Sequence, residues 1–192
     1  MDVYDAIRQR RSIRRFKQKP ISDDILKRLV DAGRIAPSAA NLQPIEYILV
    51  NGAEICSKVF ETIGWAGYIK PQWTPSLDER PTAYIVILIH KDTSFDPRRD
   101  VGLSAENIML AAEAEGLGSC MLMNIKKEKI RIILEIPDNV QIDSLIAVGY
   151  KAEKSVMVDI KNSVQYYRDE NQVLYVPKRQ LEDIIHINKY KV

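Results

Sequence analysis

The sequence of 192 residues contains only two cysteines, Cys56 and Cys120, and two histidines, His90 and His186. Two cysteines are too few for the disulfide framework of a small secreted protein, and no Cys/His spacing resembles a zinc site, so we expect no bound metal. The histidines fall in no catalytic-triad pattern, and we interpret both as structural. Cys120 follows a small-residue turn without an evident base, which favours a buried thiol over a nucleophile.

Long apolar runs are also absent. The longest, Tyr84–Ile89, is far too short to span a membrane, and the N-terminus has no apolar signal core. Hydrophobic residues make up 46% of the chain and charged residues 28%, an ordinary composition for a globular protein of one domain. We therefore expect a soluble, reduced, cytoplasmic protein that does not associate with membranes.

A strong charge imbalance and the familiar nucleotide-binding motifs are missing as well. The net charge of +2 argues against a general nucleic-acid partner, which would require a strongly basic domain. No phosphate-loop lysine motif occurs, and Gly116-Leu117-Gly118 lacks the third glycine and the preceding strand of a dinucleotide fingerprint. If the chain is an enzyme, its reactive group is therefore expected to come with a cofactor.

What the sequence does contain is a basic run, Arg8–Pro20, in which seven of thirteen residues are Lys or Arg. Ile13 and Phe16 interrupt the cations, so part of the run is expected to turn toward the core. Arginines close to a core need anions, because an unpaired buried charge is costly. The basic run therefore predicts a site for the phosphate of a cofactor.

Hydrophobic periodicity predicts a mixture of helices and short strands. Helices are expected at about 3–10, 22–35, 54–63, 100–115 and 126–136, and buried strands at 47–50, 84–89, 119–123 and 144–149. Ser22 is the expected N-cap of the second helix, and residues 164–176 resemble a hairpin. The last segment, 181–190, is predicted to be a terminal helix or an extended tail. This order of elements suits either an α+β or a wound α/β topology.

Two loops have a composition that suits a binding site. The segment Pro37–Pro44 is rich in small polar residues, which let a backbone approach a ligand closely. The longer segment 64–80 carries Trp65, Tyr68 and Trp73 with little periodicity, and loops of this kind often form pocket lids. Its aromatic residues either line a substrate opening or anchor the loop to the body of the protein.

The residues Arg10–Phe16, followed by Pro37–Pro44, resemble the FMN-dependent nitroreductase family. The resemblance continues in order through Arg80–Tyr84, the helix and Gly-Leu-Gly end of Asp100–Gly118, and Ala147–Tyr150, so that it covers essentially the whole chain. It implies an α+β fold with a central, mostly antiparallel sheet flanked by helices. It also implies an intertwined homodimer with one FMN in each of two pockets at the subunit interface.

The family's first motif implies that Arg10, Arg11 and Ser12 contact the FMN phosphate and ribityl chain, and that Arg14 lies near the pyrimidine edge of the flavin. A phosphate suits bidentate guanidinium groups and a hydroxyl donor. A cation near the N1–C2 edge would stabilise the anionic reduced flavin. The remaining arginines of the basic run are expected at the surface or in ion pairs.

The second motif implies that Pro37, Ser38 and Asn41 contact the flavin, and in this family such contacts typically come from the other subunit. A plain connection between a helix and a strand is the alternative interpretation of this loop.

Two further parts of the chain receive a role from the resemblance. In the third strand, the backbone N–H groups of Met121, Leu122 and Met123 are implied beside the flavin N5 and O4. Near the C-terminus, Arg179 is implied to reach the FMN phosphate. The resemblance further suggests a single domain over the whole chain, whose C-terminal extension from about 153 to 192 wraps the partner subunit.

The implied activity is that of an FMN-dependent NAD(P)H oxidoreductase, which transfers hydride through the flavin N5 in a ping-pong scheme. NADH or NADPH is the expected co-substrate, and a nitroaromatic or quinone-like small molecule the expected acceptor, with no catalytic side chain and no metal. One alternative on the same fold is a specialised flavin enzyme, of dehydrogenase or dehalogenase type. Others are a non-enzymatic FMN-binding or redox-sensing dimer and, ranked below both, a nucleic-acid-binding protein that uses the basic run.

Overall fold

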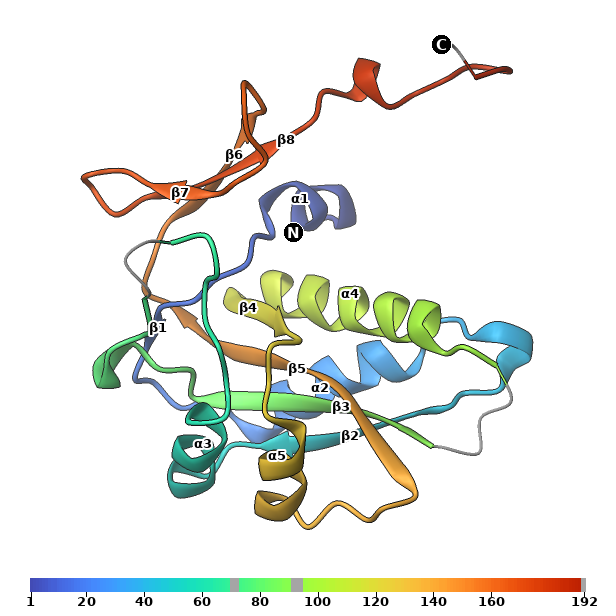
Figure 1. Cartoon of the computed structure of the whole chain (residues 1–192), viewed down its shortest axis with the longest axis vertical. Helices are drawn as coiled ribbons and strands as arrows, with labels where there is room; N and C mark the ends of the chain where they lie inside the picture. Colours follow the sequence, from blue (N-terminus) through green and yellow to red (C-terminus); the bar gives the residue numbers. More distant parts are fainter. Residues whose placement is uncertain (70–72, 91–94, 191–192) are drawn as a thin grey trace.

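A computed structural model describes residues 1–69, 73–90 and 95–190 (Figure 1). Its centre is a five-stranded sheet in which every pairing is antiparallel. The strands are β1 (Phe16–Lys17), β2 (Ile45–Val50), β3 (Ala83–His90), β4 (Leu117–Leu122) and β5 (Val140–Lys151). Their order is β1-β5-β3-β2, with β4 also paired to β5. The expected central antiparallel sheet is confirmed.

Helices cover both faces of this sheet, which makes the fold α+β (Figure 1). On one face lie α3 (Ala53–Phe60) and α5 (Lys127–Ile133), and on the other α2 (Asp23–Arg34) and α4 (Arg98–Ala114). Alternate side chains of the middle strand β3 point to opposite faces of the sheet. Because helices cover both faces, β3 is buried on both sides. This double burial explains the unbroken apolar run that the sequence shows there.

Local sequence signals set the ends of several elements. Ser22 caps α2, since its Oγ accepts a hydrogen bond from the Ile25 amide at 3.4 Å, and this prediction is confirmed. Gly116 has φ +74° and turns the chain from the end of α4 directly into β4. The strand therefore begins at Leu117 and ends at Leu122, two residues earlier at its start than the sequence suggested and one residue earlier at its end.

The first helix, α1 (Val3–Gln9), forms as predicted, but most of its apolar face is not buried within the chain. Asp2 caps it by accepting a hydrogen bond from the Asp5 amide at 2.9 Å. Only Ala6 is buried, whereas Val3 and Ile7 remain exposed. The helical spacing predicted this helix correctly, and the structure adds that two residues of its apolar face are exposed within a single chain.

A second, three-stranded sheet is built by the C-terminal part of the chain and stands apart from the main sheet (Figure 1). Its strands are β6 (Ser155–Asp159), β7 (Tyr167–Arg168) and β8 (Leu174–Lys178), in the order β6-β8-β7. The antiparallel pairing of β7 with β8 confirms the predicted hairpin. After a short 3-10 helix at Leu181–Asp183, the tail extends away from the body, with four exposed apolar side chains: Ile184, Ile185, Ile187 and Tyr190.

No helix in the described ranges is both long enough and apolar enough to cross a membrane.

Candidate functional site

The basic run crosses the end of β5, where it contacts β4 and then pairs with β5 itself through β1. Ser12 forms a parallel bridge with Ser119 of β4, and the Ile13 amide donates to the Ser119 carbonyl at 2.9 Å. A few residues later, Phe16 pairs with Lys151 of β5. Ile13 and Phe16 are both buried, so the expectation that part of the run turns inward is confirmed.

Two glycines make room for this crossing. A Cβ added to Gly118 would lie 2.8 Å from the Ile13 side chain, and one added to Gly149 would lie 2.7 Å from the Phe16 ring. Both distances are shorter than van der Waals contact, so only glycine lets the basic run lie this close to β4 and β5.

Replacing Gly149 with alanine should lower the free energy of unfolding by about 1–3 kcal/mol, because the added methyl group overpacks against a fully buried ring. Urea denaturation of the purified variant measures this loss. Gly102→Ala is the matched control, since nothing lies within 4 Å of the place that its new methyl group would occupy, and it sits inside α4, where alanine is the better helix former. Equal stability of the two variants would contradict the close approach.

A buried carboxylate holds the basic run in place. The side chain of Glu153 is 1% exposed, and its Oε1 accepts hydrogen bonds from the backbone amides of Arg14 and Arg15. Its Oε2 accepts a hydrogen bond from Arg168 Nη2 of β7 at 2.5 Å. Glu153 therefore links the N-terminal run to the C-terminal sheet. The sequence did not identify Glu153 as part of the site. Its one signal is an acidic residue two positions after the end of the apolar strand β5.

The Arg14 side chain lies among aromatic rings contributed by distant parts of the chain. Its guanidinium carbon is 4.7 Å from the centre of the Tyr166 ring, which in turn is 5.1 Å from the Tyr68 ring. Arg14 Nε is buried and has no hydrogen-bond partner among the described residues. A buried donor without a partner is costly, so this position suits an acceptor from a bound molecule.

The other two aromatic residues of segment 64–80 behave as anchors. Trp65 is buried, with its ring 5.6 Å from that of Phe60 in the core. Trp73 lies beneath the guanidinium groups of Arg15 and Arg168, at 5.3 and 5.0 Å from its ring centre. Of the two interpretations of this loop, anchoring therefore applies to both tryptophans. Residues 70–72 of the loop lie outside the described part of the chain.

The two arginines assigned to the phosphate have different surroundings. Arg10 is partly exposed, and its Nε donates to Glu106 of α4 at 3.1 Å. Arg11 is buried and donates to the carbonyl of Arg8 at 2.7 Å and to that of Arg10, which satisfies acceptors at the end of α1. Burial, together with the neighbouring charge of Arg10, lowers the pKa of Arg11.

The segment 37–44 lies at the other end of α4 from the basic run (Figure 1). Ser38 Oγ accepts a hydrogen bond from the Gln43 amide at 3.0 Å, and the Ala39 amide donates to Asp100 at 3.2 Å. Asn41 has φ +55°, a left-handed conformation that is uncommon outside glycine and is often found at functional sites. A cavity of about 120 Å³ opens beside Pro37 and Ser38. A single chain therefore does not bring this loop to the basic run.

The remaining predicted residues lie in two further places. Met121 is half-buried and Leu122 buried at the end of β4, whereas Met123 follows the strand with 70% of its surface exposed. The same strand carries Ser119, which bridges to the basic run, so β4 lies directly beside the run. Arg179 is exposed in the C-terminal extension, where its Nη2 donates to the Asp183 carbonyl at 2.6 Å.

The profile of the Nitroreductase family matches residues 7–150, which is most of the chain. This chain belongs to the nitroreductase family. A Methanothermobacter thermautotrophicus protein with the provisional name NADH dehydrogenase/NAD(P)H nitroreductase is 30% identical over 162 residues, which are 80% of this chain and 79% of that protein. An NADPH-dependent oxidoreductase of Staphylococcus aureus is 27% identical and covers 98% of this chain and 74% of its own length.

Solved structures of family members share the nitroreductase fold described above. A nitroreductase family protein from Clostridium novyi aligns with a TM-score of 0.68 at 26% identity, covering 79% of this chain and 87% of its own. An FMN-dependent nitroreductase from Clostridium difficile aligns with a TM-score of 0.70 at 24% identity, covering 96% and 98%. The resemblance and the fold class expected from the sequence are therefore confirmed.

Proposed function

We propose that this nitroreductase is an FMN-dependent NAD(P)H oxidoreductase, and that the basic run and β4 hold the cofactor. The observation that carries the proposal is the buried Nε of Arg14, which has no hydrogen-bond partner among the described residues, while the backbone amide of Arg14 is held by Glu153. This residue set fits FMN, which offers a phosphate to cations and hydroxyls at one end and carbonyl and ring acceptors at the other. Bound FMN supplies reversible hydride chemistry that no side chain of the described region offers.

Each residue has a definite task in this proposal. Arg10 and Ser12 hold the phosphate end, with Arg179 as a further donor from the extension. Arg14 presents a fixed positive charge to the pyrimidine edge, where its charge-assisted hydrogen bond favours extra electron density on the ring. Arg11 is likewise proposed to contact the FMN phosphate or ribityl chain. In the structure, its guanidinium donates a hydrogen bond to the Arg8 carbonyl of α1.

The backbone of Met121, Leu122 and Met123 is the candidate donor group beside the reactive edge of the ring. A backbone N–H keeps its direction whatever side chain it carries, so the methionines do not conflict with this task. The exposed Met123 leaves the end of β4 open to a second molecule.

A homodimer would complete the site. Pro37, Ser38 and Asn41 lie at the opposite end of α4 from the basic run, so they reach a cofactor there only from a partner subunit. The exposed apolar residues of α1 and of the C-terminal tail support such an assembly, because surfaces of this kind are usually covered in protein interfaces. We propose that the extension from about 153 to 192 wraps the partner.

The acceptor is proposed to be a nitroaromatic or quinone-like molecule that binds after the nicotinamide has left, in a ping-pong sequence. This order requires stacking room and charge stabilisation, and it requires no side chain to act as nucleophile, acid or base. The ion pairs Arg10–Glu106 and Arg15–Glu79 neutralise part of the basic run, which favours a small cofactor over a nucleic acid as its partner.

The purified protein should be yellow, and NADH or NADPH should bleach its visible absorption under anaerobic conditions. Adding a quinone or nitroaromatic should restore the colour at a rate that does not depend on the residual nicotinamide. A colourless protein that takes up no FMN would overturn the proposal. Bound flavin that neither nicotinamide reduces would point instead to a redox-sensing dimer.

A further inference from the structure

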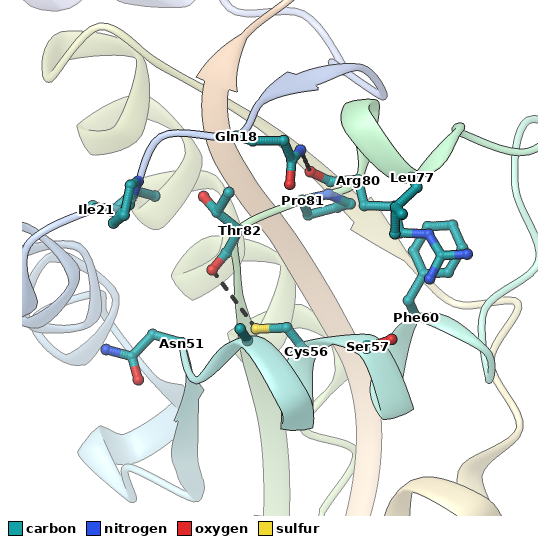
Figure 2. Close-up of a pocket in the computed structure, with 12 residues that line it drawn as sticks. Gln18, Ile21, Asn51, Cys56, Ser57, Phe60, Leu77, Arg80, Pro81 and Thr82 are labelled. Carbon is teal, nitrogen blue, oxygen red and sulfur yellow. Dashed lines mark hydrogen bonds between the residues drawn. The ribbon is translucent and has the colours of Figure 1, made fainter.

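A second cavity, of about 300 Å³, lies between α3, the 3-10 helix at Leu77–Glu79 and the segment that joins β1 to α2 (Figure 2). Its lining includes Ile21, Cys56, Phe60 and Arg80. None of its lining residues belongs to the set assigned to FMN. Part of the Arg80–Tyr84 motif, which carries the family resemblance without a role in the proposed function, forms its edge.

The walls of this cavity are mainly apolar. Figure 2 shows Ile21 on one side and Leu77, Arg80 and Phe60 on the other, with Cys56 between them. Leu77 is 74% exposed at the rim, so a ligand with an apolar body would cover a side chain that the protein leaves in water. This volume and lining are typical of a small-molecule site.

Arg80 supplies a charge to this apolar space. Its guanidinium carbon stacks 3.9 Å from the centre of the Phe60 ring, which fixes its plane. Its Nη1 lies 3.3 Å from Glu61, whose side chain is 67% exposed, so this ion pair contributes little to stability. Its Nε is buried and has no hydrogen-bond partner within the described ranges. Because Glu61 is a surface partner that is only weakly held, an incoming carboxylate can pair with the terminal nitrogens of the guanidinium in its place.

The other side chains that line the cavity are neutral, and several of them are already hydrogen-bonded. The single S–H of Cys56 has two carbonyl acceptors within reach, those of Val50 at 3.5 Å and Thr82 at 3.6 Å from Sγ, and burial raises the pKa of this thiol to about 11. Gln18 Nε2 donates to the Arg80 carbonyl at 2.8 Å. Among the described lining residues Arg80 is the only cation, which suits a single negative charge better than a phosphate.

We propose that this cavity is a second binding site, independent of FMN, for a small aromatic monocarboxylate. The carboxylate pairs with Arg80, and the ring lies against Ile21, Leu77 and Phe60. An aromatic acid bound in this cavity would act on the protein without occupying the flavin pocket.

The test titrates benzoate and its neutral isostere benzamide into the full-length protein as purified, with bound flavin if present. Amide resonances of residues 53, 57, 77 and 82 are followed by two-dimensional NMR. Benzoate should shift them saturably and bind about tenfold more tightly than benzamide, the scale of one charge-assisted hydrogen bond. The flavin absorption spectrum should not follow the same binding curve.

Arg80→Gln should abolish the preference for benzoate over benzamide, whereas Arg98→Gln, at an exposed arginine outside the cavity, should keep it. Ser57→Phe fills the cavity from an exposed position of α3 and should remove the shifts even if Arg80→Gln fails to fold. The proposal is overturned if benzoate leaves these amides unmoved in the natural protein, if benzamide binds equally well, or if Ser57→Phe binds benzoate as before.

Discussion

Glu153→Ala is expected to destabilise this nitroreductase by about 3–5 kcal/mol, because it leaves the Arg168 guanidinium buried without its counter-charge. The same change removes the acceptor of two backbone amides, those of Arg14 and Arg15, so FMN should also be held less tightly. Urea unfolding measures the first effect, and fluorescence of released flavin measures the second.

Two further variants separate charge from shape at this position. Glu153→Gln keeps an acceptor for the backbone amides and should lose less stability than the alanine variant. The double change Glu153→Gln with Arg168→Met removes both charges and should recover stability relative to Glu153→Gln alone. If Glu153→Ala unfolds at the same urea concentration as the natural protein, the carboxylate is not what holds the basic run.

Arg10→Ala is expected to weaken FMN binding about ten- to a hundredfold while leaving the fold intact, since a hydrogen bond to a charged group contributes roughly 1.5–3 kcal/mol. Arg11→Ala should lose stability as well as FMN affinity, because the donors of Arg11 also bond carbonyls at the end of α1. Comparing FMN affinity with the urea midpoint in both variants distinguishes a phosphate contact from a structural one.

Arg8→Ala is the matched control for these variants, since it lies in the same basic run and its guanidinium lies near the Tyr4 ring at the surface. Its FMN affinity should equal that of the natural protein. An equal loss in all three variants would mean that the run acts only through its total charge, and unchanged affinity in Arg10→Ala would remove the phosphate assignment.

Local chemistry allowed much of this fold to be predicted from the sequence. Ser22 was identifiable as a helix cap because the capping bond spans only three residues. The run Tyr84–Ile89 was identifiable as a buried strand because it is apolar without interruption. The structure explains this composition, since helices cover both faces of β3. Ile13 and Phe16 were expected inside because they interrupt a stretch of charges, and both are buried.

The features that the sequence did not reveal depend on contacts between distant residues. Glu153 accepts a hydrogen bond from the Arg14 amide although the two residues are 139 positions apart in the sequence. No residue near either of them indicates this contact. The parallel pairing of β6 with β8 likewise depends on how the C-terminal segment folds back. The exposed face of α1 shows the same limit, since a helical pattern identifies an apolar face without identifying what covers it.

The crossing of the basic run over β5 has a consequence for the order in which the protein can form during synthesis. The run is synthesised long before Ser119, Lys151, Ala152 and Glu153, which are the partners of its backbone. Contacts of such long sequence separation are slow to form, and domains fold as their last essential strand becomes available. The backbone of the basic run therefore cannot take its final place until β5 has been translated.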